Sequence, residues 1–308
     1  MDKCLTVLDE RNVWWRPMIE AAAARGYSCN HIRRGREVGM LDKGLGFIRP
    51  HADPAVLEQN QTDYEHMAEH LTMVQDRAQV EVYEDKSAQF WRWGKWMPPT
   101  WRFNNRQEAL DFVAKYNGRL VSKADVGASS YNVRVLDGPQ QAVQHVRELF
   151  GRGVQVNHCA GGPGGRNVVS MQRGYALLQE YIPHEVTWRV NKIGRCFAIF
   201  KRYNKPGTLT AQTGNVDGIT TGDVIQQRLD SLLEFADEVA VDIGSRWVAL
   251  DILHRDDKWF LLETSLAWPW PSPGNCMEAN FFGPTTRTWA GMWDLMLDEY
   301  EAGVWAQS

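Results

Sequence analysis

The chain has 308 residues with a formal net charge of −4, and 44% of its residues are hydrophobic and 23% charged, which is typical of a folded globular protein. The negative charge argues against a clamp that binds any nucleic acid, and no apolar run is long enough to span a membrane. The five scattered cysteines form no CxxC pair and the N-terminus carries no secretion pattern, so we expect a cytoplasmic protein with reduced thiols and no structural zinc.

The first 85 residues alternate between short apolar runs and helical periodicity. The pattern predicts helices through 18–24 and over 62–75, and strands at 4–8, 27–33, 45–48 and 79–83. This β-α-β alternation is typical of a small parallel sheet covered by helices. Residues 1–85 are therefore predicted to form an N-terminal α/β domain.

After residue 85 the regular alternation of strand and helix patterns ends, and residues 86–180 are predicted to form a second domain. Pro98 and Pro99 end any helix that begins after Lys86, and Asn104 or Asn105 is a good cap for the next one. The remaining pattern predicts helices ending at 118 and 151, strands at 119–123, 133–136 and 176–182, and a surface loop over 157–174.

Residues 181–308 are predicted to form a third domain. The pattern predicts a hairpin of strands 186–191 and 196–203, a glycine-dotted loop over 204–224, a helix over 225–241, strands at 247–253 and 259–263, and a final amphipathic helix. This part therefore combines a β-sheet with two helices.

Two carboxylates lie within neighbouring apolar strands. Asp251 is inside the first strand and Glu263 closes the second. A carboxylate in an apolar strand is costly unless a cation or a donor offsets it, and two that meet on one sheet face can hold a hard divalent ion. The alternative is a pair of edge-strand carboxylates that face solvent.

Two lysines are candidates for binding phosphate. Lys123 ends a strand and precedes a run of small residues, 126–130, whose backbone N–H groups can approach phosphate oxygens; Lys86 lies at the predicted domain boundary. A solvated lysine and an ordinary glycine turn are the alternatives, because the sequence has neither GxxxxGK[ST] nor GxGxxG.

A third motif lies at the end of the strand predicted over 176–182. It consists of Gln179, Glu180, Tyr181 and Ile182. Such a strand can offer backbone groups to an adenine edge, while Glu180 or Glu185 accepts hydrogen bonds from ribose hydroxyls.

These parts, in this order, resemble the ATP-grasp superfamily over about residues 78–266. Asp85-Lys86 before Pro98-Pro99-Thr100 is similar to the family's first lysine and the Pro-x-Thr stretch after it. The resemblance implies an α/β (α+β) fold in which the domain at 1–85 is followed by two subdomains, 86–180 and 181–308, that clamp ATP.

The resemblance also implies roles for single residues. The phosphates would contact Lys86, Lys123, Gly127, Ser129 and Ser130. The adenosine would contact Gln179, Glu180, Tyr181, Ile182 and Glu185. Phosphate or an acyl phosphate would contact the hairpin residues Arg189, Lys201 and Arg202. Magnesium would be held by Asp251, Glu263 and Ser265.

One departure from the family concerns the metal strand. The family usually closes with Glu-x-Asn, but here the run is Glu263-Thr264-Ser265. The serine side chain is shorter than that of asparagine and its oxygen is a weaker ligand, so the second metal position is expected to bind magnesium less tightly. Asn215, in the loop after the hairpin, is a candidate to compensate.

The leading hypothesis is an ATP-dependent carboxylate–amine ligase that uses ATP and Mg²⁺ and forms an amide through an acyl phosphate. Its substrates would be a small carboxylate and an amine, or a peptide or protein acceptor, and the protein could be a homo-oligomer. The alternatives are a nucleotide-binding protein without turnover, with Ser265 as the degenerate position, and an ATP-grasp phosphotransferase acting on a small alcohol.

Overall fold

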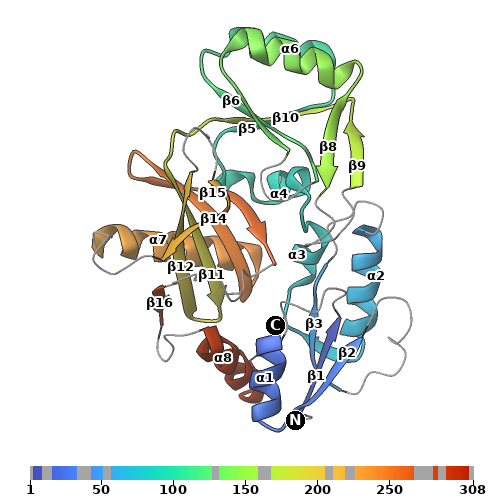
Figure 1. Ribbon diagram of the computed structural model, residues 1–308, viewed down its shortest axis with the longest axis vertical. Coiled ribbons are helices and arrows are strands. Elements are labelled where there is room, and N and C mark those ends of the chain that lie inside the picture. Colours follow the sequence, from blue (N-terminus) through green and yellow to red (C-terminus); the bar gives the residue numbers. More distant parts are fainter. Residues whose placement is uncertain are drawn as a thin grey trace.

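The computed structural model describes residues 3–8, 16–32, 43–50, 57–126, 132–158, 168–204, 211–218, 226–266, 280–283 and 289–304. Its strands form three larger sheets and one two-stranded ribbon. Figure 1 places the N-terminal sheet at one end of the long axis, the sheet with α6 at the other end, and the largest sheet beside α7 between them. No helix in these ranges is long and apolar enough to cross a membrane.

The N-terminal sheet is parallel, with strand order β2-β1-β3-β4, as the sequence pattern predicts. Its central strands are buried at every position because helices and the rest of the molecule cover both faces. The elements are β1 (Cys4–Leu8), α1 (Arg16–Ala24), β2 (Ser28–Ile32), β3 (Gly44–Ile48), α2 (Leu57–Ala68), β4 (Leu71–Met73) and α3 (Arg77–Glu81).

Two predictions for this part are wrong. Residues 79–83 belong mainly to helix α3 and its end rather than to a strand, and the helix predicted over 62–75 ends at Ala68 before β4. In α3 the Arg77 Nε atom lies 2.9 Å from Glu81 Oε1, one helical turn along. The valines at 80 and 82 alternate over too short a stretch to distinguish a strand from a helix.

The second sheet is antiparallel, with strand order β5-β10-β6-β7, and two helices cover it. Asn105 caps α5 by accepting from the backbone N–H groups of Gln107 and Glu108, which confirms one of the two predicted caps. The elements are α4 (Lys86–Trp93), the 3-10 turn η2 (Gly94–Trp96), β5 (Thr100–Phe103), α5 (Arg106–Lys115), β6 (Leu120–Lys123), β7 (Val133–Leu136), α6 (Pro139–Phe150) and β10 (Ala176–Glu180).

The predicted surface loop at 157–174 is partly wrong. A hairpin of β8 (Val154–His158) and β9 (Val168–Gln172) occupies the ends of that range. The two strands are hard to recognise in the sequence, because the glycine-rich stretch between them dominates the composition of residues 157–174.

A buried histidine joins α6 to this sheet. His145 Nε2 lies 2.8 Å from Ser122 Oγ, and its Nδ1 lies 3.2 Å from Arg134 Nη1. A guanidinium can only donate, so Nδ1 accepts and the ring is neutral with its proton on Nε2. Burial, reinforced by Arg134, lowers the pKa of His145 to about 4.

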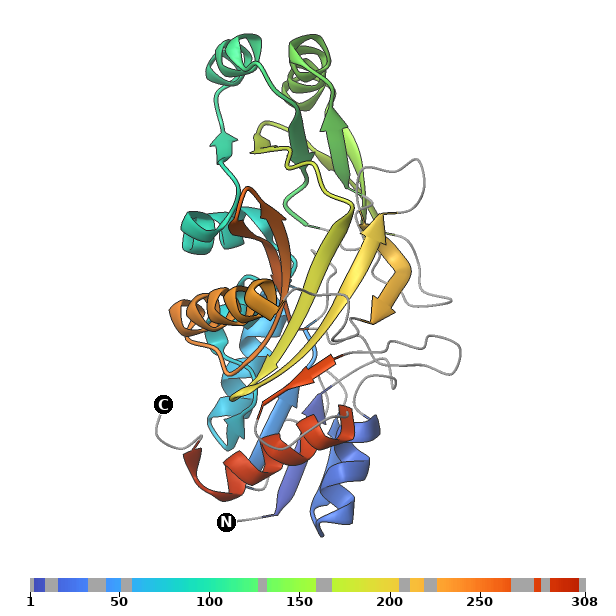
Figure 2. The ribbon, with the colours of Figure 1, turned by 90° about the vertical axis from the view of Figure 1, so that its left-hand side faces the viewer.

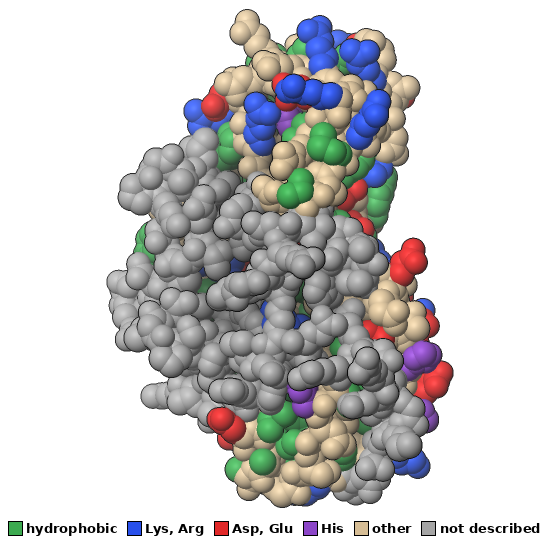
Figure 3. Space-filling view, turned by 45° about the vertical axis from the view of Figure 1, so that its right-hand side comes forward, with side chains coloured by type: hydrophobic (Ala, Val, Ile, Leu, Met, Phe, Trp, Pro, Cys, Tyr) green, Lys and Arg blue, Asp and Glu red, His purple; other side chains and the backbone are tan. Residues whose placement is uncertain are grey.

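The outer surface of the second sheet and its helices α5 and α6 is basic. Figure 3 shows Lys and Arg side chains gathered over the end of the molecule that carries α6. Arg119, Arg134 and Arg152 are at least half exposed there. The net negative charge of the chain is therefore unevenly distributed.

The third sheet has the order β13-β12-β11-β14-β15, and β16 pairs with β12. The predicted hairpin and the two predicted strands are confirmed, but β13 lies inside the predicted glycine-dotted loop. The elements are β11 (Val186–Ile193), β12 (Cys196–Asn204), β13 (Ala211–Gly218), α7 (Gln226–Ile243), β14 (Trp247–Arg255), β15 (Lys258–Ser265) and β16 (Asn280–Phe282).

The two faces of this sheet have different coverings. One face packs its alternate apolar residues against α7. Part of the other face packs against the N-terminal sheet and against α8 (Trp289–Glu301). Figure 2 shows α7 on one side of the sheet and α8 near α1, and Arg25, just after α1, lies 3.1 Å from Asp294 and 2.7 Å from Asp298 of α8.

Candidate active site

The two predicted carboxylates come together on the face of the third sheet opposite α7. Asp251 of β14 pairs in register with Glu263 of β15, immediately before a β-bulge. The strands are joined by a tight turn in which Asp256 and Asp257 both have positive φ, a conformation that aspartate tolerates and that suits a two-residue hairpin loop. In the register set by the turn, Asp251 would face Leu262; the bulge adds one residue to β15 and so places Glu263 opposite Asp251.

Two arginines neutralise Asp251. Arg189 Nη1 lies 3.0 Å from Asp251 Oδ1, and Arg202 Nη1 lies 3.2 and 3.1 Å from the two carboxylate oxygens. Burial alone would raise the pKa of Asp251, but the two guanidiniums hold it below its usual value. Cations from β11 and β12 thus offset a carboxylate that is only 4% exposed.

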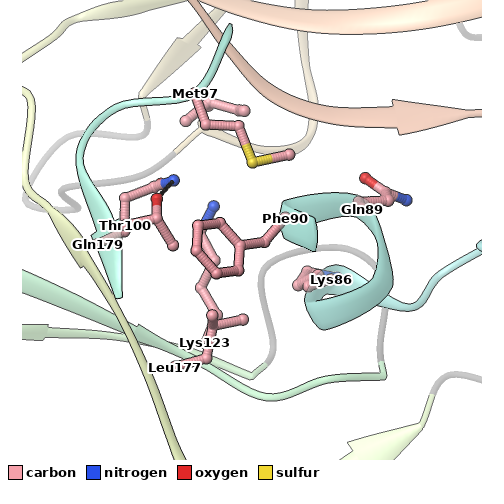
Figure 4. A pocket seen from close by; sticks show the side chains of 9 residues that line it. Lys86, Gln89, Phe90, Met97, Thr100, Lys123, Leu177 and Gln179 are labelled. Atoms are coloured by element: carbon pink, nitrogen blue, oxygen red, sulfur yellow. Dashed lines mark hydrogen bonds between the residues drawn. The ribbon is translucent and has the colours of Figure 1, made fainter. Parts of the chain in front are cut away.

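The two predicted lysines approach the same site, Lys86 from the start of α4 and Lys123 from the end of β6. Lys86 Nζ lies 3.7 Å from Glu263 Oε2. Lys86 and Lys123 line one pocket together with Thr100 and Gln179, and the Lys123 side chain extends into it (Figure 4). Burial lowers the pKa of Lys123 to about 8, with a contribution from Lys86.

The lysines meet because α4 begins where β6 ends. Asp85 caps α4 by accepting from the backbone N–H of Ala88 at 2.8 Å. The backbone N–H of Lys86 donates to the carbonyl of Asp125 at 2.7 Å, and Asp85 forms a β-bridge with Val126. These backbone contacts hold Lys86 beside the strand that ends in Lys123.

Gln89, which the sequence analysis did not select, connects α4 to the metal strand. Its Nε2 donates to the carbonyls of Thr264 at 3.1 Å and Val82 at 3.2 Å, and its Oε1 accepts from the Thr264 N–H at 3.0 Å. Thr264 lies between Glu263 and Ser265. The Gln89 amide therefore makes the pair of hydrogen bonds that a neighbouring strand would make with Thr264, and it holds β15 in position relative to Lys86.

Glu84 is a third carboxylate near the acid pair, also absent from the sequence analysis. Its backbone has a φ of 58°, which is strained for a residue with a side chain. Burial raises its pKa to about 7, opposed by Lys86 and reinforced by Glu263. No sequence motif identifies it, since its position beside Lys86 and Glu263 depends on how the chain folds.

The predicted adenosine-binding residues lie along the end of β10. Gln179 is buried and donates to Thr100 Oγ1 at 2.8 Å, and Tyr181 and Ile182 are also buried. The Glu180 carboxylate, however, accepts from Arg255 Nη1 at 2.6 Å. Of the two acids expected to accept hydrogen bonds from ribose, Glu180 is thus already engaged, whereas Glu185 is exposed.

Other predicted residues are not brought into this arrangement. Lys201 precedes Arg202 on β12, so it lies on the opposite face of the sheet, where its Nζ sits 5.4 Å from the centre of the Trp188 ring. Gly127, Ser129 and Ser130 lie outside the described residues, as does the side chain of Asn215.

The acid pair suits a hard cation. Asp251, Glu263 and Ser265 offer only oxygen atoms, the donors that magnesium prefers. In the described ranges, no three His, Cys, Asp or Glu side chains are grouped to hold a metal ion. Magnesium commonly uses one or two carboxylates and completes its shell with phosphate and water, so the residues present fit it.

No protein-family model and no curated protein matches this sequence. Solved structures do match along most of the chain. D-cycloserine synthetase DcsG has 14% identity and a TM-score of 0.61, covering 96% of this chain and 99% of its own. ATP-grasp ligase PsnB in complex with a minimal precursor, Mg and ADP has 13% identity and a TM-score of 0.60, covering 96% and 97%. D-alanine–D-alanine ligase from Bacillus anthracis in complex with ATP has 9% identity and a TM-score of 0.54, covering 86% of both chains.

Proposed function

Because the chain has the ATP-grasp fold, we propose that it is an ATP-dependent ligase that joins a carboxylate to an amine. The observation that carries this proposal is the convergence of two lysines and two arginines on one pair of carboxylates. Phosphoryl transfer requires positioning and charge neutralisation more than a covalent nucleophile. This combination of charges suits that requirement.

In the proposed reaction, an oxygen of the substrate carboxylate attacks the γ-phosphorus of ATP, and ADP leaves. The amine nitrogen then attacks the carbonyl carbon of the acyl phosphate, inorganic phosphate leaves, and the nitrogen loses a proton. Lys86 and Lys123 bind the phosphates, while Arg189 and Arg202 stabilise the negative charge that develops on the transferred group. Lys201 has no part in this assignment, because it lies on the other face of the sheet.

The proposed metal residues complete the site. Asp251, Glu263 and Ser265 would hold magnesium, which neutralises phosphate charge when it is bound. Gln179, Tyr181 and Ile182 would surround the adenine. Glu185 is the acid that we assign to the ribose.

The solved neighbours support a substrate that resembles an amino acid or a peptide. One makes a bond between two D-alanines according to its name, and another was solved with a precursor peptide. We therefore propose an amino-acid or peptide amine as the nucleophile, with a small carboxylate as its partner.

The test is ADP release from Mg-ATP in the presence of pooled carboxylates, with and without pooled amines, followed by mass spectrometry of the products. A ligase sustains ADP release over many turnovers only when both pools are present, and it forms a product with the mass of an amide. In a parallel assay with a pool of small alcohols, a phosphorylated alcohol with no amide would identify a phosphotransferase. Nucleotide binding without turnover in any pool would identify a non-catalytic protein.

A further inference from the structure

A buried asparagine lies beside the candidate active site on the third sheet. Asn191 of β11 pairs in register with Ala198 on one side and Ala249 on the other. Ala249 in turn pairs with Ser265. Two positions along each strand, and therefore on the same face of the sheet, lie Arg189, Asp251 and Glu263.

The alternation of β11 decides which way Asn191 points. Its neighbour Lys192 forms an ion pair of 3.0 Å with Asp237 of α7, so Lys192 faces α7. Asn191 therefore faces the opposite side, which is also the side of Arg189 and its contact with Asp251. Because both flanking residues are alanines, no large side chain of the neighbouring strands separates Asn191 from Arg189 and Asp251.

The amide of Asn191 is both buried and unpaired. The residue is 0% exposed, and neither Oδ1 nor Nδ2 has a hydrogen-bond partner among the residues that the structure describes. A buried amide without partners destabilises a fold, since it loses its hydrogen bonds with water and regains none. An apolar residue of similar size would avoid that cost, which indicates that the amide is used by something other than the fold.

We infer that Asn191 recognises the substrate by pairing both of its amide atoms with an amide group of an amino-acid or peptide substrate bound next to Arg189. A carboxylate would satisfy only Nδ2 and an ammonium group only Oδ1, whereas an amide group both donates and accepts. The inference rests on the proposed ligase function for the identity of the substrate, but the position and burial of Asn191 do not depend on it.

The experiment begins with the stability of the free protein, which separates a recognition residue from a structural one. Asn191→Leu removes two unpaired polar atoms, keeps the number and branching of the side-chain heavy atoms, and should raise Tm by on the order of a few degrees. The matched control is Gln75→Leu. Gln75 is an equally buried amide in the N-terminal part, but it is paired with the backbone of Ile48 at 2.7 and 3.1 Å. That control should lower Tm, and a lower Tm for Asn191→Leu would overturn the inference.

The second measurement uses ligands. A pool of dipeptides, added in the presence of Mg-ADP, should raise Tm of the wild type and leave Asn191→Leu unmoved; equal shifts in both proteins, or none in the wild type, would overturn the inference. Mg-ADP alone should raise Tm of both proteins equally. If it raises neither, the proposed function fails, whereas the comparison of the free proteins still decides whether Asn191 is structural.

Discussion

Replacing Gln89 tests how firmly α4 holds the metal strand. Gln89→Leu keeps nearly the same volume but removes three hydrogen bonds to backbone groups of Thr264 and Val82. Each such bond contributes about 1 kcal/mol net, and a buried backbone group left without a partner costs about 1–3 kcal/mol. We expect the free energy of unfolding to fall by about 3 kcal/mol or more, measured by urea denaturation with tryptophan fluorescence.

The same change should also affect metal binding, because Thr264 lies between two proposed ligands of magnesium. We expect a higher half-saturating magnesium concentration for the shift in Tm caused by ADP. The control is Gln144→Leu, on the exposed face of α6, where the amide reaches only Glu148 at 3.3 Å; its effect should stay within about 0.5 kcal/mol. If both variants unfold at the same urea concentration, Gln89 does not hold β15 in place.

Three further predictions concern other parts of the structure. Asp251→Asn should lower the free energy of unfolding by about 3 kcal/mol because it removes the negative charge that faces the guanidiniums of Arg189 and Arg202. Glu263→Gln, whose side chain is 37% exposed, should abolish turnover with little loss of stability; equal urea midpoints for the two variants would contradict this. Below pH 6.5 the unfolded chain protonates His145 while the folded chain does not until about pH 4, so stability falls as pH falls through this window, by about 2 kcal/mol between pH 7 and 5. His145→Gln should lack that slope in urea titrations at the two pH values. Ser265→Asn should lower the half-saturating magnesium concentration for ATP turnover with an intact rate, and an unchanged or higher value would argue that serine is adapted to the site.

The elements that the sequence predicts correctly are those with complete local signals. The Asn105 cap, the hairpin turned near Gly194 and the acidic strands can each be identified from a few neighbouring residues. Helix α3 is too short to show a period, and β13 is hidden by its glycines. Its pairing with β12 depends on residues distant in the sequence, which no local pattern records.

The residues of the candidate site likewise fall into those that the sequence predicts and those that it does not. The charged residues can be predicted because their order along the chain carries information, and the strand period by itself separates Lys201 from Arg202. Gln89 and Asn191 could not be predicted, because an amide has no charge pattern and its role depends on what packs against it. The cost expected for a carboxylate in an apolar strand is offset at Asp251 by arginines from other strands, which only the register of the sheet brings together.

The contact between α8 and α1 has a consequence for how this protein is synthesised. Arg25 and Asp294 are 269 residues apart, and the core of the N-terminal sheet includes Met292 and Trp293 of α8. A ribosome therefore exposes the first strands long before the helix that completes their core has been made. The buried core under α5 and α6 uses only residues between 109 and 178, whereas the core of the N-terminal sheet is completed only when α8 has been made.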